Sequence, residues 1–390
     1  MSRITLKSAL MALSLVSPLA SATTFSAFPP NARLDDGSLV ALSANLAWDN
    51  NHRESSTGPD RQADDWRRQE VGLVVVKPGV FDLQVFYDLH NEMWLGVVLG
   101  VHTPPLPGVA TSKVEIGNIK LAAGLEGVAP TRHMPFMESA AATQVFHPMV
   151  RGGINWGLTG KHWMLDIGVF ERDIDGFYDG STQLLRAAWS PTTDAGAQGH
   201  LGLALSRDQP TQGHHAGQML RGGTARWAAR GVASLLPDRL ADSGMLTAVD
   251  SVYRQNLQGM WIDGPLWLQG EYFFQQTRRD HGLGNYHGNG GYLSAGWVLN
   301  APSRRIVNGM LMQPAVANGA FGAELVARYG QVDLDDAGIA GGRLGEWTLG
   351  ANGYVGAHIK LQANLSQMHL RRAGDHRHTR AVQLRTQFFF

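Results

Sequence analysis

The sequence predicts an all-β fold, an antiparallel β-barrel that spans a membrane. Along much of the chain, segments about as long as a tilted membrane strand alternate apolar with polar side chains, and Arg380–Phe390 repeats the pattern. Barrel strands alternate in this way because one face meets lipid and the other meets a polar lumen. After residue 22 no stretch reaches the ~20 apolar residues of a membrane helix, so only a closed barrel fits a membrane.

The first 22 residues read as a secretory signal peptide. A basic start precedes an apolar stretch, and Ala20, Ser21 and Ala22 form a site of small residues for cleavage. The apolar stretch is too short to cross a membrane. We therefore expect a signal peptide at residues 1–22 and one barrel domain at residues 23–390, exported from the cytoplasm.

The alternating segments follow one another with gaps of unequal length. Each places apolar residues at every second position, as Trp163, Leu165, Ile167 and Val169 do. The segments are residues 82–89, 163–170, 200–206, 268–275, 321–329, 346–355, 358–366 and 380–390. The gaps are rich in Gly, Asp, His and Arg, and a mixture of short and long gaps is typical of barrels with short periplasmic turns and long external loops.

Large aromatic residues fall near the ends of these segments or on their apolar faces. Membrane barrels carry aromatic girdles at both lipid interfaces. We expect the girdles to include Trp261, Trp267, Tyr272, Tyr329, Trp347 and Tyr354.

Composition excludes several classes of function. The 33 Lys and Arg residues balance 33 Asp and Glu residues, so net charge indicates neither nucleic acid nor an acidic partner. The chain has no cysteine, which excludes disulfides, thiol nucleophiles and Cys-based metal sites. The pairs His214 with His215, His281 with His287 and His376 with His378 lack a third ligand at good spacing, so we expect no metal and no cofactor.

Arginine provides the strongest chemical signal. Arg67 and Arg68 open a strand, and Arg328, Lys360 and Arg385 occupy polar faces of predicted strands. A second set crowds a Gly-rich loop region: Arg207, Arg221, Arg226, Arg230 and Arg239. Rings of Arg and Lys make a pore favour anions, because guanidinium pairs with two oxygens of phosphate or carboxylate. The alternative is that these cations pair with Glu324, Asp333 and Glu346 and hold loops in place.

Six segments, in order, resemble the phosphate-selective porin O and P family of Gram-negative outer-membrane proteins. Each segment is a weak match alone, but their order over nearly the whole mature chain is specific. They are Asp65–Gly72, Gly117–Lys120 with Gly124–Glu126, Phe136–Glu138, Gly264–Tyr272, Gly291–Leu299 and Glu324–Asp336.

The resemblance implies a barrel of about 16 strands, a constriction loop folded inward within residues 125–150, and a homotrimer. It adds Lys120 to Arg67, Arg68 and Arg328 as candidates for an anion path. The chain departs from the family where Glu70 and Ser139 replace arginines and where His147-Pro148-Met149 replaces Pro-Gly-Arg. These departures remove positive charge where the family builds its anion path, so we expect weaker phosphate selectivity than in a family member with all its arginines.

The predicted function is passive diffusion of small hydrophilic solutes through an outer-membrane porin, with anions such as phosphate preferred. The pore candidates are Arg67, Arg68, Lys120, Arg328, Lys360 and Arg385, and the loop candidates are Arg221, Arg226 and Arg230. Two alternatives remain: a barrel enzyme of the outer membrane, and a secreted β-rich protein that binds sugars. No Gly-x-Ser-x-Gly, P-loop or His-Glu-x-x-His motif supports an enzyme.

Overall fold

A computed structural model describes residues 28–56, 59–211, 214–215, 218–219, 223–232, 235–236, 238–336 and 338–390. The predicted signal peptide and Arg221 lie outside these residues, and so do the side chains of His214 and His215. Among the described residues, no helix is long and apolar enough to span a membrane.

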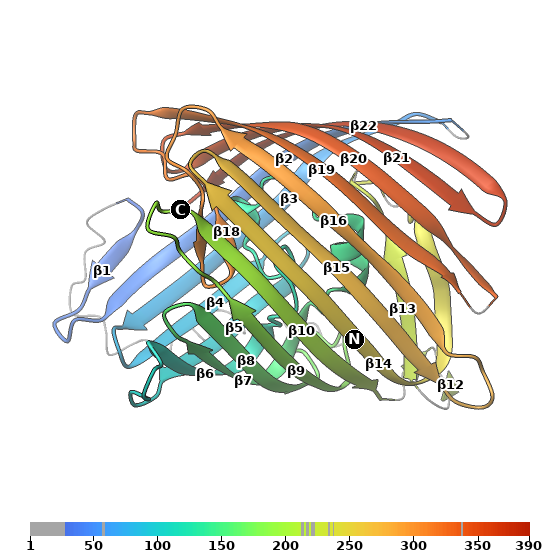
Figure 1. Ribbon diagram of the computed structural model, residues 1–390, viewed down its shortest axis with the longest axis horizontal. Coiled ribbons are helices and arrows are strands. Elements are labelled where there is room, and N and C mark those ends of the chain that lie inside the picture. Colours follow the sequence, from blue (N-terminus) through green and yellow to red (C-terminus); the bar gives the residue numbers. More distant parts are fainter. Residues whose placement is uncertain are drawn as a thin grey trace.

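Within these ranges, sixteen strands form the wall of a closed antiparallel barrel (Figure 1). The first eight are β2 (Leu39–Ser55), β3 (Arg61–Lys77), β4 (Phe81–Asp88), β5 (Met93–His102), β6 (Thr111–Lys120), β7 (Val150–Thr159), β8 (Trp163–Glu171) and β9 (Gly180–Trp189). The others are β10 (Gln198–Pro210), β14 (Ala241–Asp263), β15 (Leu266–Arg279), β16 (Tyr286–Val298), β19 (Phe321–Asp336), β20 (Ile339–Val355), β21 (Ile359–Arg372) and β22 (Asp375–Phe389).

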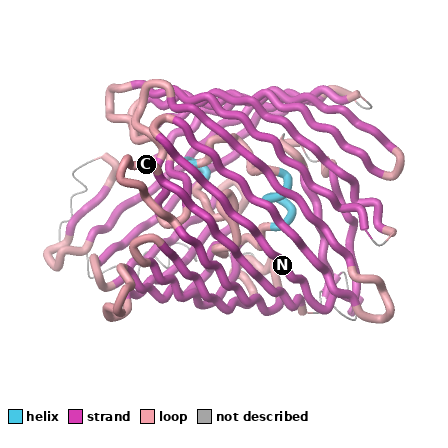
Figure 2. Tube along the Cα trace, in the orientation of Figure 1, coloured by secondary structure: helices cyan, strands magenta, loops and turns pink. Residues whose placement is uncertain are grey.

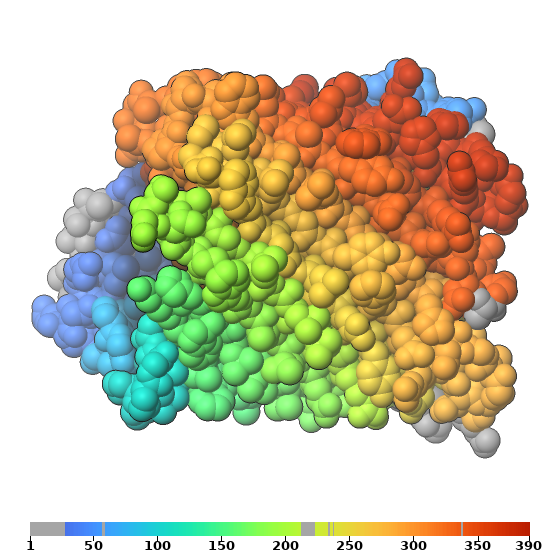
Figure 3. All heavy atoms as spheres, viewed as in Figure 1, coloured from blue at the N-terminus to red at the C-terminus, as the bar shows by residue number. Residues whose placement is uncertain are grey.

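The barrel closes where β22 pairs with β2, from Asn45 opposite Phe389 to Ser55 opposite Thr379. Closure confirms the predicted barrel and excludes an open β-sandwich. In the space-filling view of Figure 3, strands run as tilted bands in chain order from green to red. Closure leaves no unpaired sheet edge for lipid to meet.

Alternating polarity explains which face of each strand meets lipid. On β22, Val382 and Leu384 remain 46% and 52% exposed on the outside, whereas Gln383 and Arg385 are buried inside. The position of the last strand, and the face that it turns toward lipid, were therefore predicted correctly.

Strand lengths were predicted less well. The strands β4–β9 have 8 to 10 residues, near the expected length. By contrast, β14 has 23 residues, and β15, β16 and β19–β22 have 13 to 17, which is more than a tilted strand needs to cross a bilayer.

Several shorter elements accompany the wall. The strand β1 (Asn31–Arg33) pairs with the start of β2, and β13 (Gly223–Ala229) pairs with β14. Two small hairpins lie in loops: β11 (His214–His215) with β12 (Gln218–Met219), and β17 (Arg305–Val307) with β18 (Met310–Met312). In the described part of the chain, the helical elements are η2 (Thr131–His133) and α2 (Ala141–Phe146).

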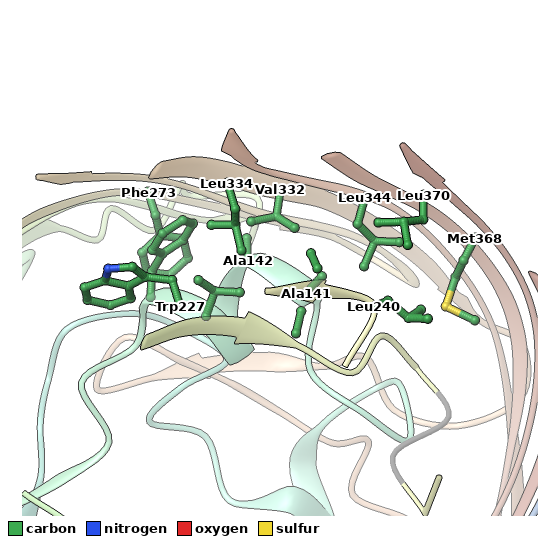
Figure 4. Packing of buried hydrophobic residues seen from close by; sticks show 14 of the residues in the cluster. Ala141, Ala142, Trp227, Leu240, Phe273, Val332, Leu334, Leu344, Met368 and Leu370 are labelled. Atoms are coloured by element: carbon green, nitrogen blue, oxygen red, sulfur yellow. The ribbon is translucent and has the colours of Figure 1, made fainter. Parts of the chain in front are cut away.

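The segment between β6 and β7, residues 121–149, folds into the barrel, and Figure 2 shows its helical turns inside the wall. This confirms the predicted inward constriction loop. We call it the constriction loop. Figure 4 shows Ala141 and Ala142 of α2 packed toward Val332 and Leu344 of the wall, with Trp227 of β13 in the same cluster. The connection between β10 and β14 therefore also contributes to the interior.

The two longest connections, residues 121–149 and 211–240, leave the same end of the barrel. Long loops mark the extracellular end of outer-membrane barrels. The opposite, periplasmic end lies at the left in Figure 1, with β1 and Phe390. It carries one long connection, residues 299–320, which holds β17 and β18.

The girdle prediction was right for some aromatics and wrong for others. Trp261, Tyr329 and Trp347 face outward with 41%, 38% and 55% exposure. Trp267 and Tyr354 are each only 1% exposed and point inward, where both donate hydrogen bonds to Glu324. A buried carboxylate that needs donors explains their inward facing.

Candidate functional site

Basic side chains of the β19–β22 wall hold the constriction loop by its backbone. Arg328 Nη1 donates to Glu138 O at 3.0 Å, and Lys360 Nζ donates to Met134 O at 2.5 Å. Arg385 Nη1 donates to Met137 O at 2.8 Å. The three cations are 1%, 0% and 3% exposed. They fill the space between wall and loop, with little access to a passing solute.

Carboxylates bind the two arginines of this set, Arg328 and Arg385. Arg328 Nη1 lies 3.1 Å from Glu126 Oε1, and Arg385 binds both oxygens of Asp49 at 2.6 and 2.7 Å. Lys360 instead donates to two carbonyl oxygens of the loop, those of Arg132 and Met134. The carboxylates offset part of the cost of burying Arg328 and Arg385, although Nε and Nη2 of Arg328 make no hydrogen bond within the described residues.

Two wall carboxylates accept hydrogen bonds from N–H groups of the loop. Glu271 accepts from Leu125 at 2.7 Å and from Glu126 at 3.0 Å. Glu346 accepts from Ala141 at 3.0 Å, just where α2 begins. The first N–H groups of a helix lack partners within it, so this carboxylate satisfies one of them.

A second anchor comes from the periplasmic connection. Arg304 enters the barrel ahead of β17 and binds Glu324 of β19 through Nε at 2.6 Å and Nη2 at 2.8 Å. Its Nη1 donates to His133 O at 2.9 Å. Both residues are 1% exposed. Arg304 therefore ties residues 299–320, the wall and the constriction loop together, and sequence reasoning missed it.

On β3, a β-bulge directs two neighbouring arginines inward. Ala47 pairs with Arg68 and Trp48 pairs with Trp66, which leaves Arg67 as the extra residue. A bulge breaks strict alternation, so both arginines reach the interior while Trp48 and Trp66 stay outside. The Arg67 side chain is 20% exposed and lies 3.1 Å from Glu138, and that of Arg68 is 19% exposed and lies 3.4 Å from Glu70.

Lys120 lies near these arginines. It is the last residue of β6, and pairing with β5 already stops at Asn118. Its exposed side chain reaches Ala129 O at 3.5 Å, and it interacts electrostatically with Arg68 and Glu70. Arg132 of η2, which sequence reasoning missed, also interacts with Glu70. We call Arg67, Arg68, Lys120 and Arg132 the pore cation group.

The remaining candidates lie apart from this group. Arg226 forms a double contact with Asp242 and its side chain is 40% exposed, and exposed Arg230 donates its backbone N–H to Gln144. Arg151 and Arg254 were not predicted. Arg151 stacks 3.7 Å from the centre of the Tyr178 ring, and Arg254 binds Asp208 at 2.7 Å. Their inward positions on β7 and β14 follow the strand alternation, which was the available signal.

The two ends of the constriction loop meet at His147. Its Nδ1 accepts from the Met149 N–H at 3.1 Å, so Nε2 donates to Leu121 O at 3.1 Å. Gly127 lies so close that an added Cβ would be 2.0 Å from the ring. Burial, together with the charge of Lys120, lowers the pKa of His147 to about 3. Burial also lowers the pKa of His133 to about 3.

The depressed pKa values of His133 and His147 predict that acid loosens the constriction loop. Both pKa values are depressed, so the ordered loop is favoured fully above about pH 6.5. As pH falls toward 3, His133 and His147 become protonated in the released loop but stay neutral in the ordered loop. This difference destabilises the ordered loop by on the order of a few kcal/mol. Hydrogen exchange of residues 121–149, corrected for intrinsic rates, should show lower protection at pH 4.5 than at pH 7. His147→Gln should reduce the pH dependence; equal protection at both pH values would contradict the account.

Comparisons with known proteins agree with this geometry. The family model described as phosphate-selective porin O and P matches residues 84–390. No curated protein sequence matches the chain.

Solved porins share the fold at low sequence identity. OmpT of Vibrio cholerae has a TM-score of 0.58 at 9% identity, covering 92% of this chain and 99% of its own. The anion-selective porin from Comamonas acidovorans has a TM-score of 0.56 at 14% identity, covering 90% and 100%. OprB of Pseudomonas putida has a TM-score of 0.54 at 10% identity, covering 90% and 94%.

Proposed function

Because the chain belongs to the phosphate-selective porin O and P family, and is thus a porin of the Gram-negative outer membrane, we propose that its pore prefers small anions modestly. The observation that carries this proposal is the pore cation group beside the constriction loop. Its members Arg68 and Lys120 keep accessible side chains, unlike the loop anchors. Solutes pass by diffusion, and their charge and size decide the rate.

The charge near the pore cation group supports only a modest preference. Its four cations face three carboxylates: Glu70, Asp88 and Glu138. The positive field that attracts anions into a narrow low-dielectric passage is therefore partly cancelled. Arginine strengthens phosphate binding, because its guanidinium donates hydrogen bonds to two phosphate oxygens at once. However, Glu70 and Ser139 stand where the family carries arginines, so phosphate should be discriminated weakly from other anions.

Toward the periplasmic end the inner wall carries charges of both signs. Lys113 lies 3.3 Å from Asp82 and 2.8 Å from Glu115, and Asp166 pairs across strands with Arg186. Three carboxylates there nearly balance two cations. This near balance is a second reason to expect weak selectivity.

We assign Arg328, Lys360 and Arg385 to the support of the constriction loop and not to the solute path. All three donate to loop carbonyls, the two arginines also bind carboxylates, and burial leaves little surface for an anion. Exposed Arg226 and Arg230 instead suit the outer mouth, where they would attract anions from a distance.

Diffusion through such a pore requires no bond to be made or broken, so we propose that the chain catalyses no reaction and uses no cofactor. We further propose a homotrimer in outer-membrane lipid, because a trimeric form of OmpT of Vibrio cholerae is among the similar structures. The signal peptide at residues 1–22 and the barrel domain at residues 23–390 remain predictions.

Neutralising two members of the pore cation group should shift selectivity toward cations. In a planar bilayer with a salt gradient, Arg68→Ala with Lys120→Ala should move the reversal potential by several millivolts or more in the cation direction. Chloride conductance with phosphate titrated in should also show weaker block by phosphate.

Arg33→Ala with Lys161→Ala is the matched control. It removes the same charge from exposed positions in the β1–β2 hairpin and the β7–β8 turn. The control should leave the reversal potential unchanged. If the Arg68 and Lys120 variant behaves like the control, the proposed anion path is wrong while the barrel stands.

A further inference from the structure

Polar and charged side chains face outward at the extracellular ends of β19–β22. These strand ends lie at the right of Figure 1. Cross-strand register arranges them in three rows. The outermost row is Asp333, Arg343, Arg371 and His376; the next is Gln331, Gly345, His369 and His378; the third is Tyr329, Trp347, Gln367 and Arg380. The fourth row is fully apolar: Ala327, Leu349, Leu365 and Val382.

The rows locate the lipid boundary on this wall. Leu349, Leu365 and Val382 are 58%, 56% and 46% exposed, so the fourth row meets acyl chains. Tyr329 and Trp347 pack at 4.6 Å between ring centres directly above it, as an interfacial girdle does. The two outermost rows, which hold Arg343, Arg371 and three histidines, therefore lie at the height of lipid headgroups.

A groove of about 440 Å³ opens between these rows. Gly345 forms part of its floor, and a Cβ built there would meet no atom within 4 Å. Trp347 borders it on the lipid side, and Arg343, Arg371 and His369 border it on the solvent side. The groove thus combines an aromatic platform with cations directly above.

The two arginines of the groove differ in how the protein neutralises them. Arg343 and Arg371 stand directly opposite on neighbouring strands, and like charges so placed destabilise a sheet. Arg343 Nε lies 2.9 Å from Asp333 and 3.7 Å from Asp335. Within the described ranges, no carboxylate lies in ion-pair distance of exposed Arg371. An anionic group between the two arginines would remove this repulsion.

We propose that this groove binds the phosphorylated glucosamine headgroup of lipid A, the glycolipid of the outer leaflet. Its phosphates would meet Arg343 and Arg371, its sugar would cover Trp347 and Gly345, and its acyl chains would follow Leu349 and Leu365. Arginine forks match phosphate oxygens, and juxtamembrane cations strengthen binding to anionic lipids. The site is separate from the pore and faces the opposite side of the wall.

Native mass spectrometry of the full protein in detergent, titrated with lipid A, tests the proposal. Arg343→Ala with Arg371→Ala should weaken lipid A binding by roughly 30-fold, from two lost headgroup cations. Arg33→Ala with Lys161→Ala removes equal charge at the periplasmic end and should bind within twofold of the unaltered protein. Lipid A without phosphates, and phosphatidylglycerol, should both bind weakly.

A second variant distinguishes loss of the groove from misfolding of the barrel. Gly345→Leu fills the groove without removing charge and should weaken lipid A binding while keeping normal migration on heated and unheated gels. Undiminished lipid A binding by both groove variants would overturn the proposal. Binding of phosphate-free lipid A or of phosphatidylglycerol as strong as that of lipid A would overturn it too. The site would then recognise only apolar chains or overall charge.

Discussion

Glu324→Ala is expected to destabilise the folded barrel by about 3–5 kcal/mol, because it leaves the Arg304 charge buried without its carboxylate. Glu324 also accepts hydrogen bonds from Trp267, Asn352 and Tyr354, each at 2.8 Å. Those donors lose their partner as well. The temperature at which the folded gel band converts to the unfolded one should fall.

The same substitution should loosen the constriction. Arg304 connects Glu324 to His133 O of the constriction loop, so the loop and residues 299–320 lose a shared anchor. Single-channel conductance should rise and become noisier.

Asp333→Ala is the matched control for this experiment. It lies on the same strand, but its partner Arg343 has a side chain that is 64% exposed, so its loss should cost at most about 1 kcal/mol. Equal melting and equal conductance of the two variants would mean that the Arg304–Glu324 anchor has no special role.

Removal of Phe388–Phe390 is expected to prevent assembly in the outer membrane. Phe390 exchanges backbone hydrogen bonds with Ala44 at 3.0 and 3.2 Å, and Phe389 N–H donates to His358 O at 2.9 Å. These bonds complete the closure of β22 against β2 and β21. Without them, the ends of β2 and β21 keep unpaired backbone groups that lipid cannot satisfy.

Fractionation and heat-modifiable migration measure this outcome. Phe388→Ala removes one ring but keeps every backbone bond, so it should assemble with little loss. Normal outer-membrane yield of the shortened chain would refute the importance of these closing bonds.

The fold was largely predictable because its signal is local. Period-two alternation, as in Trp163 to Val169, is read within one strand and assigns lipid and lumen faces directly. Strand length is not local. The extra length of β14 depends on pairing with β13 and on contacts with the folded-in loops, which no single strand's polarity reveals.

The inner contacts were less predictable because their partners lie far apart in the chain. Arg385 meets Asp49 across 336 positions, and Arg328 meets Glu126 across 202. The alternative reading of the arginines named Glu324, Asp333 and Glu346 as partners. Each does pair with an arginine, namely Arg304, Arg343 and Arg328.

The bulge at Arg67 was the least predictable local feature. Strict alternation would direct one of Arg67 and Arg68 outward, toward lipid, where a charge costs about 2–4 kcal/mol at the midplane. The bulge avoids this cost, and nothing in the residues around it requires a bulge without knowledge of β2. The pairing partner, Ala47 and Trp48, sets its position.

The most direct test of the central claim is the reversal potential of the unaltered protein in a planar bilayer under a potassium chloride gradient. The pore cation group predicts a modest potential of the sign that chloride flow produces, reduced further when phosphate is added. A potential of the opposite sign, from a pore that passes potassium better than chloride, would contradict the account.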